Sequence, residues 1–327
     1  VDYAADHNIT RITIQPGSYV ESIRIHIPDE SELSVLEIYG TPHQTVIRPP
    51  LGNSPSRQLF TTYSSTLERF ELKDIIFNGQ LNTGQPIPNC LGAIHLQGNI
   101  SEAVINNCTI KNFNGYCSDW DDAYEGRAIR TAVPTLISNC LIFNNSGLYS
   151  SVGDIGPQEI VSISNSSVIS NCKIYDNSAA YDGTIYIRGS GSLTMMNNVF
   201  YDNGCDPDQL TSGSVIGIFN ESVPEQSVRI VNNTFTNSVT IYPTDLSAIR
   251  IGGQSVVELS NNIIEEYPTA ISKDVDSNAS ILINNNLFWH NTSDFEGVSY
   301  DISQNLGNCF FEDPVLNEDF VPIWNAN

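Results

Sequence analysis

The fold of this chain is decided by the stretch Val104-Ile105-Asn106-Asn107-Cys108-Thr109-Ile110, because the same phrase recurs along the sequence. The phrase reads apolar, any residue, polar, Asn, Asn or Cys, any residue, apolar. Self-similarity at a period of a few tens of residues is typical of solenoid proteins, in which each repeat forms one coil. Further copies begin at Leu136, Val168, Met195, Ile230, Leu259 and Ile283, and a weaker copy begins at Leu72.

One position of the phrase holds Asn, Cys or Asp in every copy, and successive copies are 24 to 35 residues apart. The residue two places further on is always apolar, while helical spacing is nowhere sustained. These features predict short β-strands separated by a polar bend. Amides stacked at the bend can donate to and accept from neighbouring coils, so we expect an internal ladder. Its expected members are Asp74, Cys108, Cys140, Cys172, Asn198, Asn233, Asn262 and Asn286.

Three consecutive members of this ladder are cysteines. Free Cys is among the most buried residue types, so we interpret them as small packing residues. The alternative is a metal site of three stacked thiols, although no His lies at ligand spacing. The chain has 7 Cys, and the other four are Cys90 and Cys117, which could form a disulfide between successive coils, and Cys205 and Cys309.

A second strand precedes each phrase and is often introduced by Gly, as in Gly92-Ala93-Ile94-His95-Leu96 and Gly183-Thr184-Ile185-Tyr186-Ile187. Each repeat therefore reads strand, turn, strand, polar bend, strand, loop. Coils of this kind stack at the inter-strand spacing of about 4.8 Å and bury one continuous core. A single repeat system over 327 residues predicts one all-β domain, 1–327.

The chain resembles the right-handed parallel β-helix repeat proteins of the pectate-lyase-like superfamily. Besides the phrase, the resemblance rests on Ile12-Thr13-Ile14-Gln15-Pro16-Gly17, similar to the first coil of secreted bacterial and archaeal members, and on the closing Phe310-Phe311-Glu312-Asp313-Pro314-Val315. It implies a single-stranded right-handed parallel β-helix of about eight to nine coils, with an opening coil in 1–40 and a closing segment in 300–327. It also implies a secreted or cell-surface protein. The superfamily holds lyases, hydrolases, esterases, adhesins and structural proteins, so the resemblance does not choose an activity.

The charge of the chain excludes several classes of partner. It has 37 acidic and 14 basic residues, for a net charge of −23. Such a surface argues against binding to nucleic acid or to anionic membranes. No segment is apolar over the length needed to span a bilayer, so we expect no membrane insertion. We expect a monomer or a part of a longer surface chain.

A strip of chemically active residues is expected on the strand that precedes each phrase. The residue after the central Ile of that strand should face outward, because side chains alternate along a strand. A register slip of one residue would turn the whole set to the other face. The first outward position holds His95, Arg130, Tyr186 and Arg250, and the next one holds Arg188 and Phe219.

This strip is suited to an acidic polysaccharide. Guanidinium groups pair with carboxylates in a bidentate manner, so Arg130, Arg188 and Arg250 are candidate ligands for sugar carboxylates. Lyase chemistry on a uronate needs charge neutralisation by Arg130 or Arg188 and proton transfer by His95 or Tyr186. The alternative is that the arginines only balance nearby acids on a very acidic surface.

A second candidate is the acidic and aromatic loop between residues 112 and 125. Clustered carboxylates can bind Ca²⁺, which takes oxygen ligands in flexible geometry. A pair of them could instead act as acid and base in glycoside hydrolysis, and the rings could support a sugar. The alternative is a solvated acidic loop. The carboxylates are Asp119, Asp121, Asp122 and Glu125, and the rings are Trp120 and Tyr124.

The leading interpretation is an extracellular β-helix protein that binds an acidic polysaccharide along this strip, with cleavage left open. If it is an enzyme, a lyase is favoured over a glycoside hydrolase, because the Asp-rich constellation expected of polygalacturonase-like hydrolases is absent from the strip. No serine nucleophile motif, phosphate loop, dinucleotide fingerprint or zinc motif is present. The alternative is a non-catalytic adhesin or envelope spacer, since Ile174-Tyr175-Asp176-Asn177 resembles repeats of surface proteins. Ca²⁺ is the one cofactor considered.

Overall fold

Strands are the only regular elements in the part of the chain that the structure describes. The structure is a computed structural model, and it describes residues 9–25, 27, 32–49, 58–62, 64–80, 92–113, 128–147, 161–163, 165–179, 183–187, 191–205, 213–220, 226–238, 246–298, 306–307 and 309–316. Among these residues there is no helix long and apolar enough to cross a membrane.

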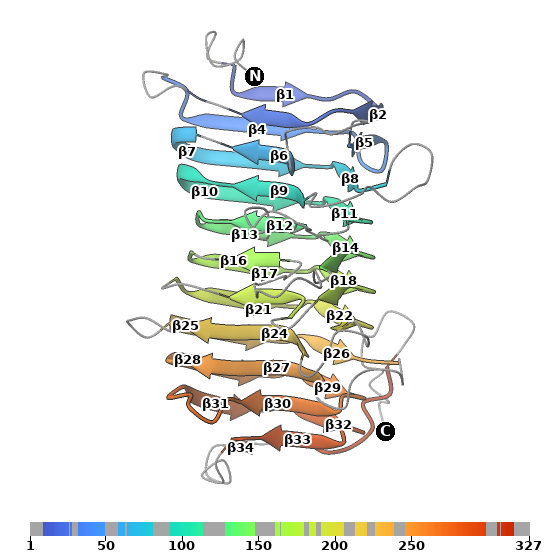
Figure 1. The fold of residues 1–327 in the computed structure, drawn as a ribbon, viewed down its shortest axis with the longest axis vertical. Helices are drawn as coiled ribbons and strands as arrows, with labels where there is room; N and C mark the ends of the chain where they lie inside the picture. Colours follow the sequence, from blue (N-terminus) through green and yellow to red (C-terminus); the bar gives the residue numbers. More distant parts are fainter. Residues whose placement is uncertain are drawn as a thin grey trace, which may run out of the picture.

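The strands form three long parallel sheets, which we call sheets 1, 2 and 3 (Figure 1). Sheet 1 has 11 strands, in the order β1 (Arg11–Thr13), β4 (Val35–Tyr39), β7 (Ser64–Lys73), β10 (Gly98–Asn106), β13 (Thr135–Ser138), β17 (Ser167–Ser170), β21 (Leu193–Met196), β25 (Gln226–Val231), β28 (Ser255–Ser260), β31 (Ser280–Asn284) and β34 (Leu306–Gly307).

Sheet 2 has 10 strands, in the order β2 (Gly17–Val20), β5 (Thr45–Arg48), β8 (Ile76–Asn78), β11 (Thr109–Lys111), β14 (Leu141–Phe143), β18 (Lys173–Tyr175), β22 (Val199–Tyr201), β26 (Thr234–Thr236), β29 (Ile263–Glu265) and β32 (Leu287–Trp289). A small sheet follows it in three coils, with β15 (Ser146–Gly147), β19 (Ser178–Ala179) and β23 (Gly204–Cys205).

Sheet 3 also has 10 strands, in the order β3 (Ile23–Ile25), β6 (Gln58–Thr62), β9 (Gly92–Leu96), β12 (Ile129–Thr131), β16 (Val161–Ile163), β20 (Ile185–Ile187), β24 (Gly213–Asn220), β27 (Leu246–Gly253), β30 (Thr269–Lys273) and β33 (Ser293–Glu296).

One strand from each sheet makes one coil, so the chain is a parallel β-helix, which confirms the predicted fold class. It has about ten coils rather than eight or nine. The difference lies in the first two coils, β1–β3 and β4–β6, whose sequence lacks the Asn phrase. In the second of these coils the bend between β4 and β5 is held differently, since the Thr45 hydroxyl accepts from the Thr41 N–H at 2.8 Å.

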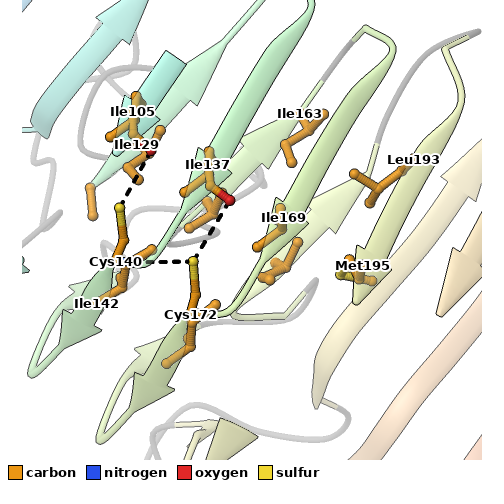
Figure 2. Packing of buried hydrophobic residues seen from close by; sticks show 14 of the residues in the cluster. Ile105, Ile129, Ile137, Cys140, Ile142, Ile163, Ile169, Cys172, Leu193 and Met195 are labelled. Atoms are coloured by element: carbon orange, nitrogen blue, oxygen red, sulfur yellow. Dashed lines mark hydrogen bonds between the residues drawn. The ribbon is translucent and has the colours of Figure 1, made fainter. Parts of the chain in front are cut away.

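The core lies between the three sheets and runs through all the coils. Figure 2 shows Ile105 and Ile137 of sheet 1, Ile129 and Ile163 of sheet 3, and Ile142 of sheet 2 pointing toward one another. These five side chains are at most 1% exposed. The repeated Ile positions therefore stack into continuous apolar columns, as expected for a solenoid that buries its core between neighbouring coils.

The predicted ladder is present inside the bend between sheets 1 and 2. Asn198, Asn233, Asn262 and Asn286 are at most 1% exposed. The Asn198 Nδ2 donates to Asn233 Oδ1 at 2.9 Å, and the Asn233 Nδ2 donates to Asn262 Oδ1 at 3.1 Å. Each amide also donates to a carbonyl of the preceding coil, as Asn198 does to Ile169 at 2.9 Å. The ladder thus satisfies buried polar groups in an apolar interior.

The prediction that Asp74 is the first member of the ladder is wrong by one residue. Asp74 has φ 62° and shares its conformation with Asn107 and Asn139, the left-handed residues that precede the ladder. The inward position is taken by Ile75, which is fully buried. Asp and Asn both tolerate positive φ, which is why Asp74 imitates a ladder residue in the sequence.

The three cysteines of the ladder use the same acceptors as the asparagines. The Cys140 thiol donates to the Ile105 carbonyl at 3.6 Å, and the Cys172 thiol donates to the Ile137 carbonyl at 3.7 Å (Figure 2). The backbone N–H of Cys140 in turn donates to the sulfur of Cys172 at 3.4 Å. No group of three or more metal-ligating side chains occurs among the described residues. Cys108, Cys140 and Cys172 are free, buried thiols.

Two of these thiols, Cys108 and Cys140, are expected to be unreactive in the folded protein. Burial raises the pKa of Cys108 to about 12, and burial together with Cys172 raises the pKa of Cys140. A raised pKa means that the reactive thiolate is scarce at pH 8, and the core also excludes the reagent. Iodoacetamide followed by peptide mass spectrometry should find Cys108 and Cys140 alkylated only after denaturation. Equal labelling of native and denatured protein would contradict this.

A second amide ladder, which the sequence analysis missed, follows sheet 2. The Asn145 Nδ2 donates to Asn177 Oδ1 at 3.0 Å, and the Asn177 Nδ2 donates to Asn203 Oδ1 at 2.9 Å. All three are at most 2% exposed. The sequence contains a signal for it, because each of these Asn residues follows a member of the first ladder by five positions. The residue before it adopts the left-handed conformation, as Asp176 does with φ 51°.

Candidate functional site

The outer face of sheet 3 carries one continuous column of side chains. The strand register pairs His95 with Arg130, Arg130 with Ser162, and Ser162 with Tyr186. It then continues through Gly217 to Arg250. The structure therefore places His95, Arg130, Tyr186 and Arg250 in the same column, whereas their roles remain predictions. The whole column is Arg24, Thr61, His95, Arg130, Ser162, Tyr186, Gly217, Arg250, Ser272 and Glu296.

Arg24 is a member of this column that the sequence analysis did not name. It is exposed and lies two coils before His95, in register with Thr61. The signal was available, because Ile23-Arg24-Ile25 shows the same alternation as Ile249-Arg250-Ile251. The absence of the Asn phrase from the first two coils concealed it.

The column is more recessed than an ordinary outer sheet face. His95 and Tyr186 are each 9% exposed, and Arg130 is half-buried. In six coils the residue two places before the column residue is small or β-branched and almost fully buried. These buried residues are Ala93, Ala128, Thr184, Val215, Ala248 and Ala270.

Four side chains form a packed cluster in the later coils of this face. The rings of Tyr186 and Phe219 are 5.7 Å apart, centroid to centroid, with an interplanar angle of 31°. The guanidinium carbon of Arg250 lies 5.2 Å from the centroid of Phe219. The Nε of Arg250 donates to Asp274 Oδ1 at 2.9 Å. We call Tyr186, Phe219, Arg250 and Asp274 the aromatic cluster.

The packing of the aromatic cluster requires a glycine in the neighbouring coil. Gly252 is in register with Phe219, one coil further on. A Cβ at this position would come within 2.6 Å of Phe219 Cδ1 and 2.8 Å of Asp274 Oδ2. Any side chain here would displace the Phe219 ring or the carboxylate, so the packing of the cluster depends on Gly252.

Several predicted site residues cannot be placed on this face. Arg188, Trp120, Tyr124 and the proposed calcium ligands Asp119, Asp121, Asp122 and Glu125 lie outside the described residues. The calcium site therefore stays a prediction. The link between Arg250 and Asp274 was missed, because it joins side chains of two coils rather than neighbours in the sequence.

Sheet 2 carries a different outward feature, a stack of three aromatic rings. Phe143 and Tyr175 lie 4.7 Å apart, and Tyr175 and Tyr201 lie 4.5 Å apart, with nearly parallel planes. Burial raises the pKa of both tyrosines, and burial and Asp202 raise the pKa of Asp176 beside them. These ring faces are used to stack on one another, so the feature is better explained as packing between coils.

The outer face of sheet 1 has a shallow hollow of about 240 Å³. Its lining includes the apolar residues Leu136 and Val168 and the acidic residue Glu102. No cationic side chain lines it among the described residues, so it offers nothing to an acidic polymer. Its remaining lining residues are Pro134, Thr135, Ser166, Ser167, Ser192 and Thr194.

Solved structures with a similar fold have different activities. The chain is similar to the Azotobacter vinelandii mannuronan C-5 epimerase AlgE6 A-module, with 13% identity, a TM-score of 0.46, and coverage of 95% of this chain and 93% of that chain. It is also similar to the Streptococcus pneumoniae surface protein and adhesin PfbA, with 14% identity, a TM-score of 0.48, and coverage of 95% and 94%. A third similar structure is the pectin methylesterase from Yersinia enterocolitica, with 12% identity, a TM-score of 0.43, and coverage of 96% of this chain and 93% of that chain.

No curated protein matches the sequence. At such identities the structural similarities concern the fold, and the activities stay with the proteins named. The sequence itself matches the profile of the family described as "Right handed beta helix region" over residues 71–242. This match covers more than half of the 327 residues, so the chain belongs to the right-handed β-helix family.

Proposed function

We propose that this protein binds an extended acidic polysaccharide along the outer face of sheet 3. The observation that supports the proposal is the register of the column, which sets Arg24, His95 and Arg130 on one line. Successive coils are about 4.8 Å apart, a spacing comparable to one sugar residue of an extended chain. In a polymer lying along the helix axis, each successive sugar residue would therefore lie beside the column side chain of the next coil.

The side chains have separable roles in this proposal. Arg130 pairs with a sugar carboxylate, because a guanidinium offers two parallel N–H donors. Phe219 and Arg250 remain proposed contacts for a sugar residue. Arg188 remains a proposed second carboxylate ligand. The predicted group at Asp119, Asp121, Asp122 and Glu125 remains a proposed Ca²⁺ site.

Lyase activity is a second candidate, supported by the direct pairing of His95 with Arg130 in adjacent strands. In such a reaction a base removes the proton beside the sugar carboxylate, and the glycosidic C–O bond breaks as a C=C bond forms. The departing oxygen takes a proton from an acid. Arg130 would neutralise the charge that develops on the carboxylate, and His95 would move a proton.

Replacing Arg130 with alanine is expected to weaken binding of an oligouronate about 10- to 100-fold, because a hydrogen bond to a charged group contributes about 1.5–3 kcal/mol. Isothermal titration calorimetry at low ionic strength measures this, since salt screens such pairs. The matched control is Arg229→Ala, which removes an arginine paired with Glu258 at 2.9 Å on sheet 1. Unchanged binding in Arg130→Ala, or equal losses in both variants, would contradict the location.

A polysaccharide panel with and without Ca²⁺ tests the function itself. Ultraviolet absorbance of unsaturated uronate together with new reducing ends would identify a lyase, and reducing ends alone a hydrolase. Binding without turnover would identify an adhesin. If the protein neither binds nor cleaves any polysaccharide of a broad panel, the proposal is overturned and the envelope spacer is the remaining interpretation. We also propose a secreted or cell-surface location, as expected for a protein that binds an extracellular glycan.

A further inference from the structure

We infer that the outer face of sheet 2 is an interface between two copies of this chain, related by a two-fold axis parallel to the strands. The two β-helices are antiparallel in this dimer, so that β2 of one copy faces β32 of the other and β14 faces β18. The inference does not rest on the proposed function, because sheet 3 is a different face of the helix. It replaces the monomer expected from the sequence with a dimer.

The first argument is the composition of this face. In six of the ten strands, the outward residue nearer the ladder bend is aliphatic and half-buried. The outer face of sheet 1 carries ion pairs instead, such as Arg229 with Glu258. Apolar side chains gathered on an outer face favour association, because docking removes their remaining surface from water. The six residues are Val46, Ile76, Leu141, Val199, Ile263 and Leu287.

The second outward column of the face is aromatic at its centre. Phe143 and Tyr175 are 4.7 Å apart at an interplanar angle of 5°, and Tyr175 and Tyr201 are 4.5 Å apart at 8°. These spacings are close to the distance of about 4.8 Å between coils, so the ring faces stack on one another and the ring edges point away from the sheet. The centre of the face therefore offers apolar ring edges, and not ring faces, to a second copy.

The charges on this face, and on the bend that follows it, are divided between its two halves. From β5 to β14, the charged residues described there are Arg48 and Lys111, both cationic. From β18 to β29, four carboxylates accompany one lysine, Lys173. A face with a basic half and an acidic half is complementary to itself when the two copies run in opposite directions. The four carboxylates are Asp176, Asp202, Glu265 and Glu266.

The antiparallel arrangement brings opposite charges together. Pairing β5 with β29 sets Arg48 opposite Glu265 of the second copy, and pairing β11 with β22 sets Lys111 opposite Tyr201 and beside Asp202. Burial raises the pKa of Glu265, so a cation opposite this carboxylate stabilises its charged form. A parallel arrangement would set Arg48 on Arg48 and Glu265 on Glu265, and like charges across an interface repel each other.

The size of the face predicts the strength of the dimer. Ten strands of about three residues, spaced by about 4.8 Å, give a footprint of roughly 43 by 10 Å on each copy. This area lies at the small end of specific interfaces, so the dimer is weak and its population depends on protein concentration.

Sedimentation velocity over about two decades of protein concentration tests this interface. The wild type should change from monomer to dimer as its concentration rises. Glu265→Arg sets an arginine opposite Arg48 of the second copy and should raise the dissociation constant of the dimer at least about tenfold. The double variant Arg48→Glu with Glu265→Arg exchanges the two signs and should restore the dimer.

A second pair of variants leaves these charges intact. Leu141→Asp puts a carboxylate at the centre of the face and should favour the monomer, whereas the matched control Leu282→Asp changes a leucine that is 45% exposed on sheet 1 and should leave the dimer unchanged. The double variant loses the hydrogen bond from Arg48 to the Gln80 carbonyl, so the leucine pair decides if circular dichroism shows that it does not fold.

Three results would overturn the inference. The first is a wild type that stays monomeric at every concentration, and the second is an equal loss of the dimer in both leucine variants. The third is a folded double variant that stays monomeric, which would exclude the antiparallel pairing of Arg48 with Glu265. None of these results bears on the proposed function, which is measured by glycan binding on sheet 3.

Discussion

Replacing Asn233 with alanine is expected to lower the free energy of unfolding by about 3–5 kcal/mol. Asn233 is 1% exposed, and its Oδ1 accepts from both the backbone N–H and the Nδ2 of Asn198, each at 2.9 Å. Its Nδ2 donates to Met195 O at 3.0 Å and to Asn262 Oδ1 at 3.1 Å. Alanine removes the acceptor of the Asn198 backbone N–H and one hydrogen bond each from Asn198 Nδ2, Met195 O and Asn262 Oδ1. An unsatisfied buried group costs about 1–3 kcal/mol, and each further lost bond about 0.5–1.5 kcal/mol.

Urea denaturation followed by circular dichroism measures this loss. The matched control is Asn232→Ala, the preceding residue, which is exposed and has φ 57°. It should cost only about 1–2 kcal/mol, because alanine pays a steric penalty in the left-handed conformation but leaves the buried ladder intact. Equal costs for the two variants would show that the bend, and not the ladder, stabilises the coil.

The repeat made most of this fold predictable. Apolar residues at fixed distances from the Asn position predict which side chains face inward, and Ile105, Ile137 and Ile169 do so. The same alternation predicts the outward column of sheet 3 from His95 to Arg250. Both inferences need only the local chemistry of a strand, in which neighbouring side chains point to opposite faces.

Interactions between coils were harder to predict. The Arg250–Asp274 pair depends on how 24 residues return to the next coil, and no local pattern records that distance. The number of coils was underestimated because the first two coils lack the Asn phrase, and in the second of them the Thr45 hydroxyl accepts a hydrogen bond at the bend. The second ladder was overlooked because its Asn residues lie outside the repeated phrase, although they follow it at a constant distance.

Replacing Phe200 with alanine is expected to lower the free energy of unfolding by about 3–5 kcal/mol, the usual cost of removing a buried aromatic side chain. Phe200 lies in β22 and stacks on Phe235 of β26 inside the core, with centroids 4.6 Å apart and an interplanar angle of 4°. Both rings are fully buried. The loss combines removed apolar contacts with a cavity that the flanking coils cannot close, because each strand is held by two neighbours.

The matched comparison is Phe143→Ala in the outer stack on sheet 2. Phe143 and Tyr175 stack almost identically, 4.7 Å apart at 5°, but Phe143 is only half-buried. Stacking itself contributes about 0.5–1.5 kcal/mol, so this variant should cost about 1–2 kcal/mol. Because the two stacks share their geometry and differ in burial, the difference between the variants in urea denaturation measures what burial adds. Equal losses would mean that stacking between coils, rather than the apolar core, stabilises this part of the helix.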